Sequence, residues 1–138
     1  MKNFKLTSTC ESVELGEIQQ VEQQIGVTLP KIYKHFLLVN NGGTSTRNLF
    51  LSDEVGFTIE EFLSLEEFVK TSLVVRDDIP EIKEADMEVI AYTLAAPVVC
   101  IGTGERNFSK IYYFEVAIEP ILIANDLTDF INNLKDED

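Results

Sequence analysis

The residues best suited to catalysis or metal binding are few and far apart in this chain. Its 138 residues include one histidine, His35, and two cysteines, Cys10 and Cys100. A Ser-His-Asp or Cys-His catalyst would have to use His35, which the pattern places mid-helix beside Phe36, and no nucleophile elbow is present. We interpret His35 as a half-buried structural residue and the cysteines as small, buried or half-buried thiols that share no disulfide.

Carboxylates are abundant, and some occur as adjacent pairs that could in principle act as acid and base. Adjacent residues on a helix or strand point in different directions, so such pairs rarely share a pocket. A charged surface suits them better. The pairs are Glu60/Glu61, Glu66/Glu67 and Asp77/Asp78.

The sequence contains no motif for a metal or a cofactor. One histidine and two distant cysteines cannot form a paired-imidazole zinc site or a zinc knuckle, and the calcium-loop pattern of spaced acids and a glycine is absent. The segment "GTGERNFSK" at 102–110 fits neither the P-loop nor the dinucleotide fingerprint, and it joins two predicted strands instead of opening a helix. We predict no catalytic residue, no cofactor and no metal, and we favour a binding protein over an enzyme.

The formal net charge of −13 is the strongest compositional feature. Nucleic acids and anionic membranes are bound through lysine and arginine, so this charge argues against both and predicts a basic partner. Twelve acidic but only three basic residues lie between Asp53 and Glu88. Taken alone, this density is typical of a solvated surface that keeps the protein soluble, and a partner-binding surface is the alternative. The absence of an apolar run of roughly 20 residues, and of an apolar signal segment, favours the cytoplasm.

Two helices are predicted at the start of the chain. Ile18, Val21 and Ile25 recur at helical spacing, which predicts an amphipathic helix over 14–25 that ends at Gly26. Pro30 suits the first turn of a second helix, and "NNGG" at 40–43 suits its end. The second helix is expected to bury Tyr33, Phe36, Leu37 and Asn40 and to expose Lys31 and Lys34.

The next part of the chain changes to short β-rich runs and then returns to a helix. "NLFL" and "FTI" are predicted strands on either side of the turn-like "SDEVG". "SLEE" at 64–67 fits a capping box, which predicts a helix from Leu65 to about Val74. This helix is expected to bury Leu65, Phe68, Val69 and Leu73. The acidic segment "RDDIPEIKEADME" is predicted to be a connection broken by Pro80.

Four further runs, "EVIAYTL", "PVVCIG", "KIYYFEV" and "ILIA", are rich in β-branched and aromatic residues. The gaps between them are too short for helical crossovers, which predicts one mostly antiparallel sheet. Asp126 is the expected N-cap of a last helix that buries Leu127, Phe130, Ile131 and Leu134. The tail "KDED" is expected to be solvated. These elements predict a single α+β domain over residues 1–138, with a central sheet flanked by helices.

The order of motifs resembles the N-terminal signature of the SUKH superfamily, which is named partly after fungal cell-wall-synthesis regulators of the Smi/Knr type. The similar features are a glutamate-rich helix, "IG", a hydrophobic link, "LP", "Y", "FL" and "NGG". The C-terminal runs "IA", "VCIG", "KIYYF" and "FINNL" are also similar, so the resemblance covers about Glu14 to Leu134. The motif residues with an expected structural role are Gly26, Leu29, Pro30, Tyr33, Phe36, Leu37, Asn41, Gly42 and Gly43.

The resemblance implies an α+β fold and, for bacterial members, an immunity protein that binds and neutralises a toxin encoded beside it. Neutralisation would occur by occlusion of the active site or substrate channel of the toxin. Many such toxins are nucleases with a basic groove for phosphates, which an acidic protein can occupy. We place the partner-binding surface at the local acidic excess, with the carboxylates Glu60, Glu61, Asp77, Asp78, Glu81 and Glu84 as its residues.

Two other functions remain open from the sequence. A regulatory scaffold of the fungal cell-wall-regulator type would recruit cellular proteins instead of a toxin. A small hydrolase would need activity that depends on His35 or on one carboxylate pair. The sequence does not define the oligomeric state or the identity of the toxin.

Overall fold

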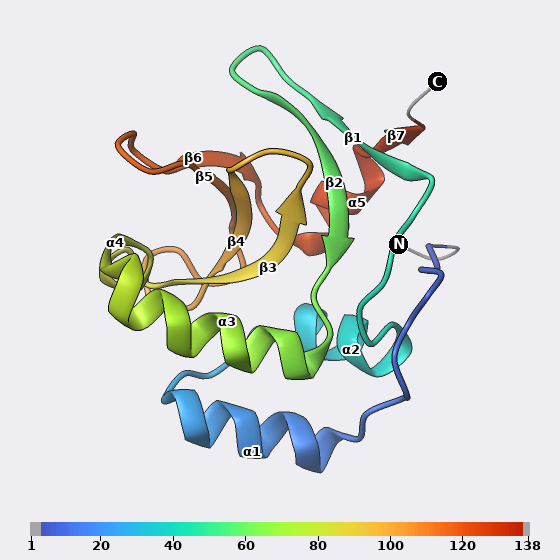
Figure 1. Cartoon of the computed structure of the whole chain (residues 1–138), viewed down its shortest axis with the longest axis vertical. Helices are drawn as coiled ribbons and strands as arrows, with labels where there is room; N and C mark the ends of the chain where they lie inside the picture. Colours follow the sequence, from blue (N-terminus) through green and yellow to red (C-terminus); the bar gives the residue numbers. More distant parts are fainter. Residues whose placement is uncertain (1–3, 137–138) are drawn as a thin grey trace.

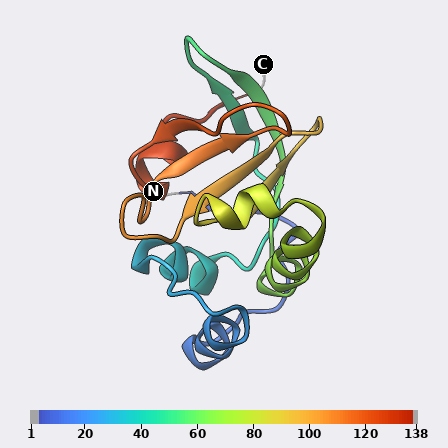
Figure 2. The same ribbon diagram turned by 90° about the vertical axis from the view of Figure 1, so that its left-hand side faces the viewer.

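The computed structural model describes residues 4–136 of the chain. In this part, a curled antiparallel sheet of seven strands packs with five helices, which confirms the predicted α+β class (Figure 1). Helices α2 and α3 lie below the sheet, and α1 lies below them as an outer layer (Figure 2). The helices are α1 (Leu15–Ile25), α2 (Lys31–Val39), α3 (Leu65–Asp78), α4 (Pro80–Glu84) and α5 (Leu127–Asn132), and the strands are β1 (Arg47–Leu51), β2 (Gly56–Phe62), β3 (Met87–Thr93), β4 (Val98–Gly102), β5 (Ile111–Phe114), β6 (Ile121–Ala124) and β7 (Lys135–Asp136).

The strands lie in the order β6-β5-β4-β3-β2-β1-β7, and each neighbouring pair is antiparallel. Short turns connect β3 to β6 as a meander, as the sequence predicts, while α3 and α4 are inserted between β2 and β3. The tail departs from expectation because β7 pairs with β1. Lys135 and Asp136 are exposed but hydrogen-bonded in the sheet, and a strand of two polar residues carries no pattern that could predict it. The last two residues of that tail lie outside the described part.

The core lies where the curled sheet closes around α5 and meets the lower helices. Phe130 of α5 packs against Phe50 and Phe57 of the β1–β2 hairpin, with ring centroids 5.5 and 6.4 Å apart. At the other end, Phe36 of α2 lies 5.3 Å from Phe62 of β2. All of these rings except Phe57, which is half-buried, are buried, and aromatic side chains contribute much of the burial that holds such cores together.

The first two helices have the predicted limits, but α2 turns its polar residues differently. Gly26 ends α1 in the left-handed conformation, with φ of 75°. Lys34 is half-buried and not fully exposed, because its Nζ lies 3.2 Å from Glu22 Oε2 on α1. His35 is exposed, so the prediction of a half-buried histidine is wrong. The packing of α1 against α2 covers the Lys34 side of the helix and leaves His35 toward solvent.

The third helix has the predicted start and a later end. Ser64 Oγ accepts the Glu67 N–H, and the Glu67 carboxylate accepts the Ser64 N–H, so the capping box is confirmed. The helix continues to Asp78, and its buried residues include Ser72 and Val75, while Val69 and Leu73 are only half-buried. The segment predicted as a plain connection contains α4, because proline suits the first turn of a helix.

The "NNGG" segment joins the end of α2 to two distant parts of the chain. The Leu6 N–H donates to Asn40 Oδ1 over 3.0 Å, and Gly43 exchanges backbone hydrogen bonds with Phe62. The "NNGG" segment is therefore a structural junction between the end of α2, the N-terminal segment and β2.

Within residues 4–136, no helix is long and apolar enough to cross a membrane.

Candidate functional site

The six carboxylates predicted to bind a partner lie in two separate places. Glu60 and Glu61 are on β2, where Glu61 pairs with Tyr92 near the end of β3. Asp77 and Asp78 end α3, and Glu81 and Glu84 lie on α4, which leads into the start of β3. From Met87 to Tyr92 a strand advances about 17 Å at roughly 3.3 Å per residue. The structure therefore brings together four of the six residues at the α3–α4 corner and leaves the other two apart.

An open groove of about 460 Å³ lies between α4 and the β5–β6 turn. Glu81 and Glu84 line it from the helix, and Ile118 and Glu119 line it from the turn. Both glutamates of α4 and both turn residues are exposed, and Ile118 keeps 44% of its surface accessible. We call this set the α4 groove. It combines three carboxylates with an exposed apolar side chain, a composition that is complementary in charge to a basic protein surface.

The orientation of α4 is set by what the helix buries. Ile82 is fully buried, and Lys83 Nζ donates to Glu88 Oε2 on β3 over 2.6 Å and to Ser72 Oγ on α3 over 2.5 Å. Because residues 82 and 83 face inward, Glu81 and Glu84, three positions apart, share the opposite side of the helix. The buried ion pair thus positions the two carboxylates of the groove.

Glu88 itself does not belong to the acidic surface in which the sequence places it. It is only 1% exposed and forms the ion pair with Lys83. Burial, together with the negative charge of Glu88, raises the pKa of the Tyr33 hydroxyl and of the Cys100 thiol. Cys100 is therefore held as a neutral thiol inside the core, which is the opposite of what a nucleophilic cysteine requires.

The other residues considered for chemistry lie apart from the α4 groove. Cys10 is exposed, contrary to the prediction of a buried or half-buried thiol, and both cysteines are free. No cluster of three or more His, Cys, Asp or Glu side chains in the described residues could hold a metal ion. Ile118 and Glu119 of the α4 groove are not among the residues predicted from the sequence. An available signal was the short segment "AIEP" between two strands, with an apolar residue and an acid in a turn.

Glu61 differs from the exposed carboxylates because it is half-buried, and it lies at a register shift of β2 between Ile59 and Glu61. Partial burial raises its pKa, and the neighbouring Glu67 carboxylate raises it further by charge and hydrogen bonding, with a smaller effect from Glu60. The ionised form of Glu61 is therefore disfavoured in the folded protein, so folding should become more favourable as the pH falls through this raised pKa.

We expect Glu61→Gln to increase the free energy of unfolding at pH 7 by about 0.3–0.5 kcal/mol, the usual size of a like-charge repulsion on a protein surface. The gain should disappear below the ordinary carboxyl pKa of 4.5, where the wild-type carboxyl is protonated in both states. Urea unfolding at pH 7 and at low pH measures this difference. The matched variant Glu60→Gln should gain less at pH 7, and an equal gain in both variants would show that the local pair is not the cause.

Comparison with known proteins identifies the family of this chain. Residues 13–133 match the model of the SMI1 / KNR4 family (SUKH-1). The chain therefore belongs to the SMI1 / KNR4 family, and the resemblance to the SUKH superfamily is confirmed. No curated protein matches the sequence closely enough to add a relative.

Proposed function

We propose that this protein is an immunity protein that binds a cognate toxin domain and neutralises it by occlusion. The observation that carries the proposal is the α4 groove, an acidic and partly apolar hollow on a member of the SMI1 / KNR4 family. The net charge of −13 supports a basic partner, such as a nuclease domain with a phosphate-binding channel. We place the complex in the cytoplasm, and we expect the partner to be encoded by a neighbouring gene.

The groove supports occlusion through two complementary effects. Glu81, Glu84 and Glu119 would attract the lysine and arginine side chains that a nuclease uses for phosphates, which speeds association at low salt. Ile118 would provide an apolar anchor of the kind that limits dissociation. The bound immunity protein would cover the substrate channel of such a partner, so neutralisation would need no catalysis by the immunity protein.

The charges are tested by the double variant Glu81→Gln/Glu84→Gln. Since exposed charge pairs contribute about 0.2–1 kcal/mol each, we expect an increase in Kd of about tenfold and a weaker dependence of association on salt. The matched control is Asp53→Asn/Glu54→Gln in the exposed β1–β2 turn, which lies away from α4 in Figure 1. Isothermal titration calorimetry with the purified toxin domain, at low and at high salt, gives the Kd and its salt dependence. Equal weakening by the two double variants would place the interface outside the α4 groove.

The function itself is tested by co-expression with the toxin domain encoded by the adjacent gene. Growth should be restored by the wild-type protein, and failure to restore it would contradict the proposal. Capture of several cellular proteins, with no toxin gene nearby, would favour instead the regulatory scaffold of the fungal cell-wall-regulator type. Loss of an enzymatic activity on replacing His35 would favour the hydrolase.

A further inference from the structure

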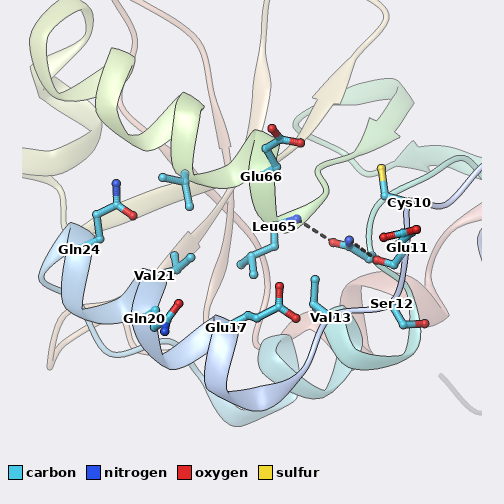
Figure 3. A pocket seen from close by; sticks show the side chains of 12 residues that line it. Cys10, Glu11, Ser12, Val13, Glu17, Gln20, Val21, Gln24, Leu65 and Glu66 are labelled. Carbon is cyan, nitrogen blue, oxygen red and sulfur yellow. Dashed lines mark hydrogen bonds between the residues drawn. The ribbon is translucent and has the colours of Figure 1, made fainter.

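A second groove lies between α3, α1 and the N-terminal segment (Figure 3). Its volume is about 510 Å³, and it is open to solvent along α1. Val13, Val21, Leu65 and Val69 give it an apolar floor, to which all three segments contribute. We call it the α1–α3 groove. Because it lies between two helices, its shape suits an added helix more than an extended strand.

The floor of the α1–α3 groove is fixed by the junction that contains the family motif. Asn41, which is 8% exposed, accepts the Leu65 N–H on its Oδ1 over 2.8 Å. Its Nδ2 donates to the Glu11 carbonyl over 2.7 Å, so one side chain ties the N-terminal segment to the start of α3 (Figure 3). The groove is therefore preformed, and a partner would not have to order it on binding.

The charges around the apolar floor all have one sign. Glu11, Glu17 and Glu66 are exposed lining residues, and among residues 4–136 no lysine, arginine or histidine lines the groove. Glu17 Oε1 accepts the Glu14 N–H over 3.0 Å, which holds that carboxylate at the groove edge. Glu66 also pairs with Lys70 at 3.3 Å, but both side chains are more than 70% exposed, so this pair is weak.

We propose that the α1–α3 groove binds a basic amphipathic helix of a partner protein. Apolar side chains on one face of that helix would occupy the floor between Val21 and Leu65, and flanking lysine or arginine side chains would meet Glu11, Glu17 and Glu66. The charge complementarity excludes an acidic helix. This surface is separate from the α4 groove, so the inference does not depend on the proposed toxin.

The test uses a synthetic, amidated helical peptide with leucine on one face and lysine and arginine on the others. A second peptide with the leucines replaced by glutamine is the matched ligand. Cys10 lines the groove and is exposed, while Cys100 is fully buried, so alkylation of the native protein by iodoacetamide reports on the groove alone. We expect the leucine peptide to slow alkylation of Cys10 at least fivefold and the glutamine peptide to have little effect.

The groove is blocked by Gln20→Trp, since Gln20 is an exposed lining residue of α1. The control Gln23→Trp is on the same helix, equally exposed but outside the groove. The Kd of the leucine peptide should rise at least tenfold in Gln20→Trp and stay unchanged in Gln23→Trp and in Glu81→Gln/Glu84→Gln. Equal weakening in the two tryptophan variants, or weakening only in the α4 variant, would overturn the proposal. A concentration-dependent dimer of the protein alone that Gln20→Trp abolishes would also overturn it, because the occupant would be a second copy.

Discussion

Replacing Lys83 with methionine is expected to lower the free energy of unfolding by about 3–5 kcal/mol, because it leaves a buried carboxylate without its cation. Glu88 is 1% exposed, and its Oε2 lies 2.6 Å from Lys83 Nζ. Its Oε1 has no hydrogen-bond partner among the described residues. Lys83 is thus the one close positive charge that these contacts give Glu88, and methionine preserves the length of the side chain while removing that charge.

The double variant Lys83→Met/Glu88→Met separates loss of the ion pair from loss of packing. Apolar replacement of a whole buried pair is often close to neutral, so most of the lost stability should return. Lys70→Met is the control for an exposed pair and should cost less than about 1 kcal/mol. Urea unfolding followed by circular dichroism measures all three. If Lys83→Met costs no more than Lys70→Met, the pair is not a structural anchor of α4.

The same experiment bears on the candidate site, because Lys83 fixes the side of α4 that faces solvent. If the proposed function holds, Lys83→Met should weaken binding of the proposed toxin domain as well as stability, since Glu81 and Glu84 would lose their orientation. The groove and the buried pair share α4, which carries Glu81 and Glu84 on one side and Lys83 on the other.

The features that the sequence predicts well depend on signals within a few residues. The Ser64–Glu67 capping box, the left-handed Gly26 and the Asp126 cap are each defined by neighbours in the chain, and all three are present. The strand runs are similarly local, because the alternation and β-branched content belong to single strands. These local signals were sufficient for the α+β class and for most of the elements, but not for α4 or β7.

The misplaced residues depend on contacts between distant elements. Glu88 reads as an exposed acid in the sequence, but β3 is buried along nearly its whole length beneath α3 and α4, so the carboxylate is buried too. Lys34 and His35 are adjacent on α2, and only the packing of α1 decides which is covered. A helical pattern identifies the apolar side of a helix, but it does not show which polar residues beside that side are covered by another element.

The α4 groove combines residues that charge density marks in the sequence with residues that only the fold brings together. Charge density pointed to Glu81 and Glu84, which do line a groove. Ile118 and Glu119 lie more than thirty positions further along the chain, and only the fold brings their turn beside α4. The α1–α3 groove combines three segments, and neither its apolar floor nor its acidic edge forms a continuous motif.

Replacing Gly42 with alanine is expected to lower the free energy of unfolding by about 3–4 kcal/mol, as the sum of a strained backbone and an overpacked contact. The φ of Gly42 is +78°, a conformation that side chains disfavour, and an added Cβ would lie 2.6 Å from the Ser64 nitrogen. Ser64 is the N-cap of α3, so the clash acts on the capping box and on the start of the helix. Neither the added Cβ nor the Ser64 nitrogen can move away without a shift of the backbone.

Two other glycines separate these causes. Gly26 has φ of +75° but open space around its Cβ position, so Gly26→Ala should cost only about 1–2 kcal/mol, the conformational part alone. Gly16 lies in the first turn of α1 with neither constraint, and Gly16→Ala should stabilise the protein by about 0.4–1 kcal/mol, because alanine restricts the unfolded chain. Thermal and urea unfolding of the three variants should give this order. If Gly42→Ala cost no more than Gly26→Ala, glycine would be needed at position 42 only for its backbone conformation. The close approach of residue 42 to Ser64 would then not explain that glycine.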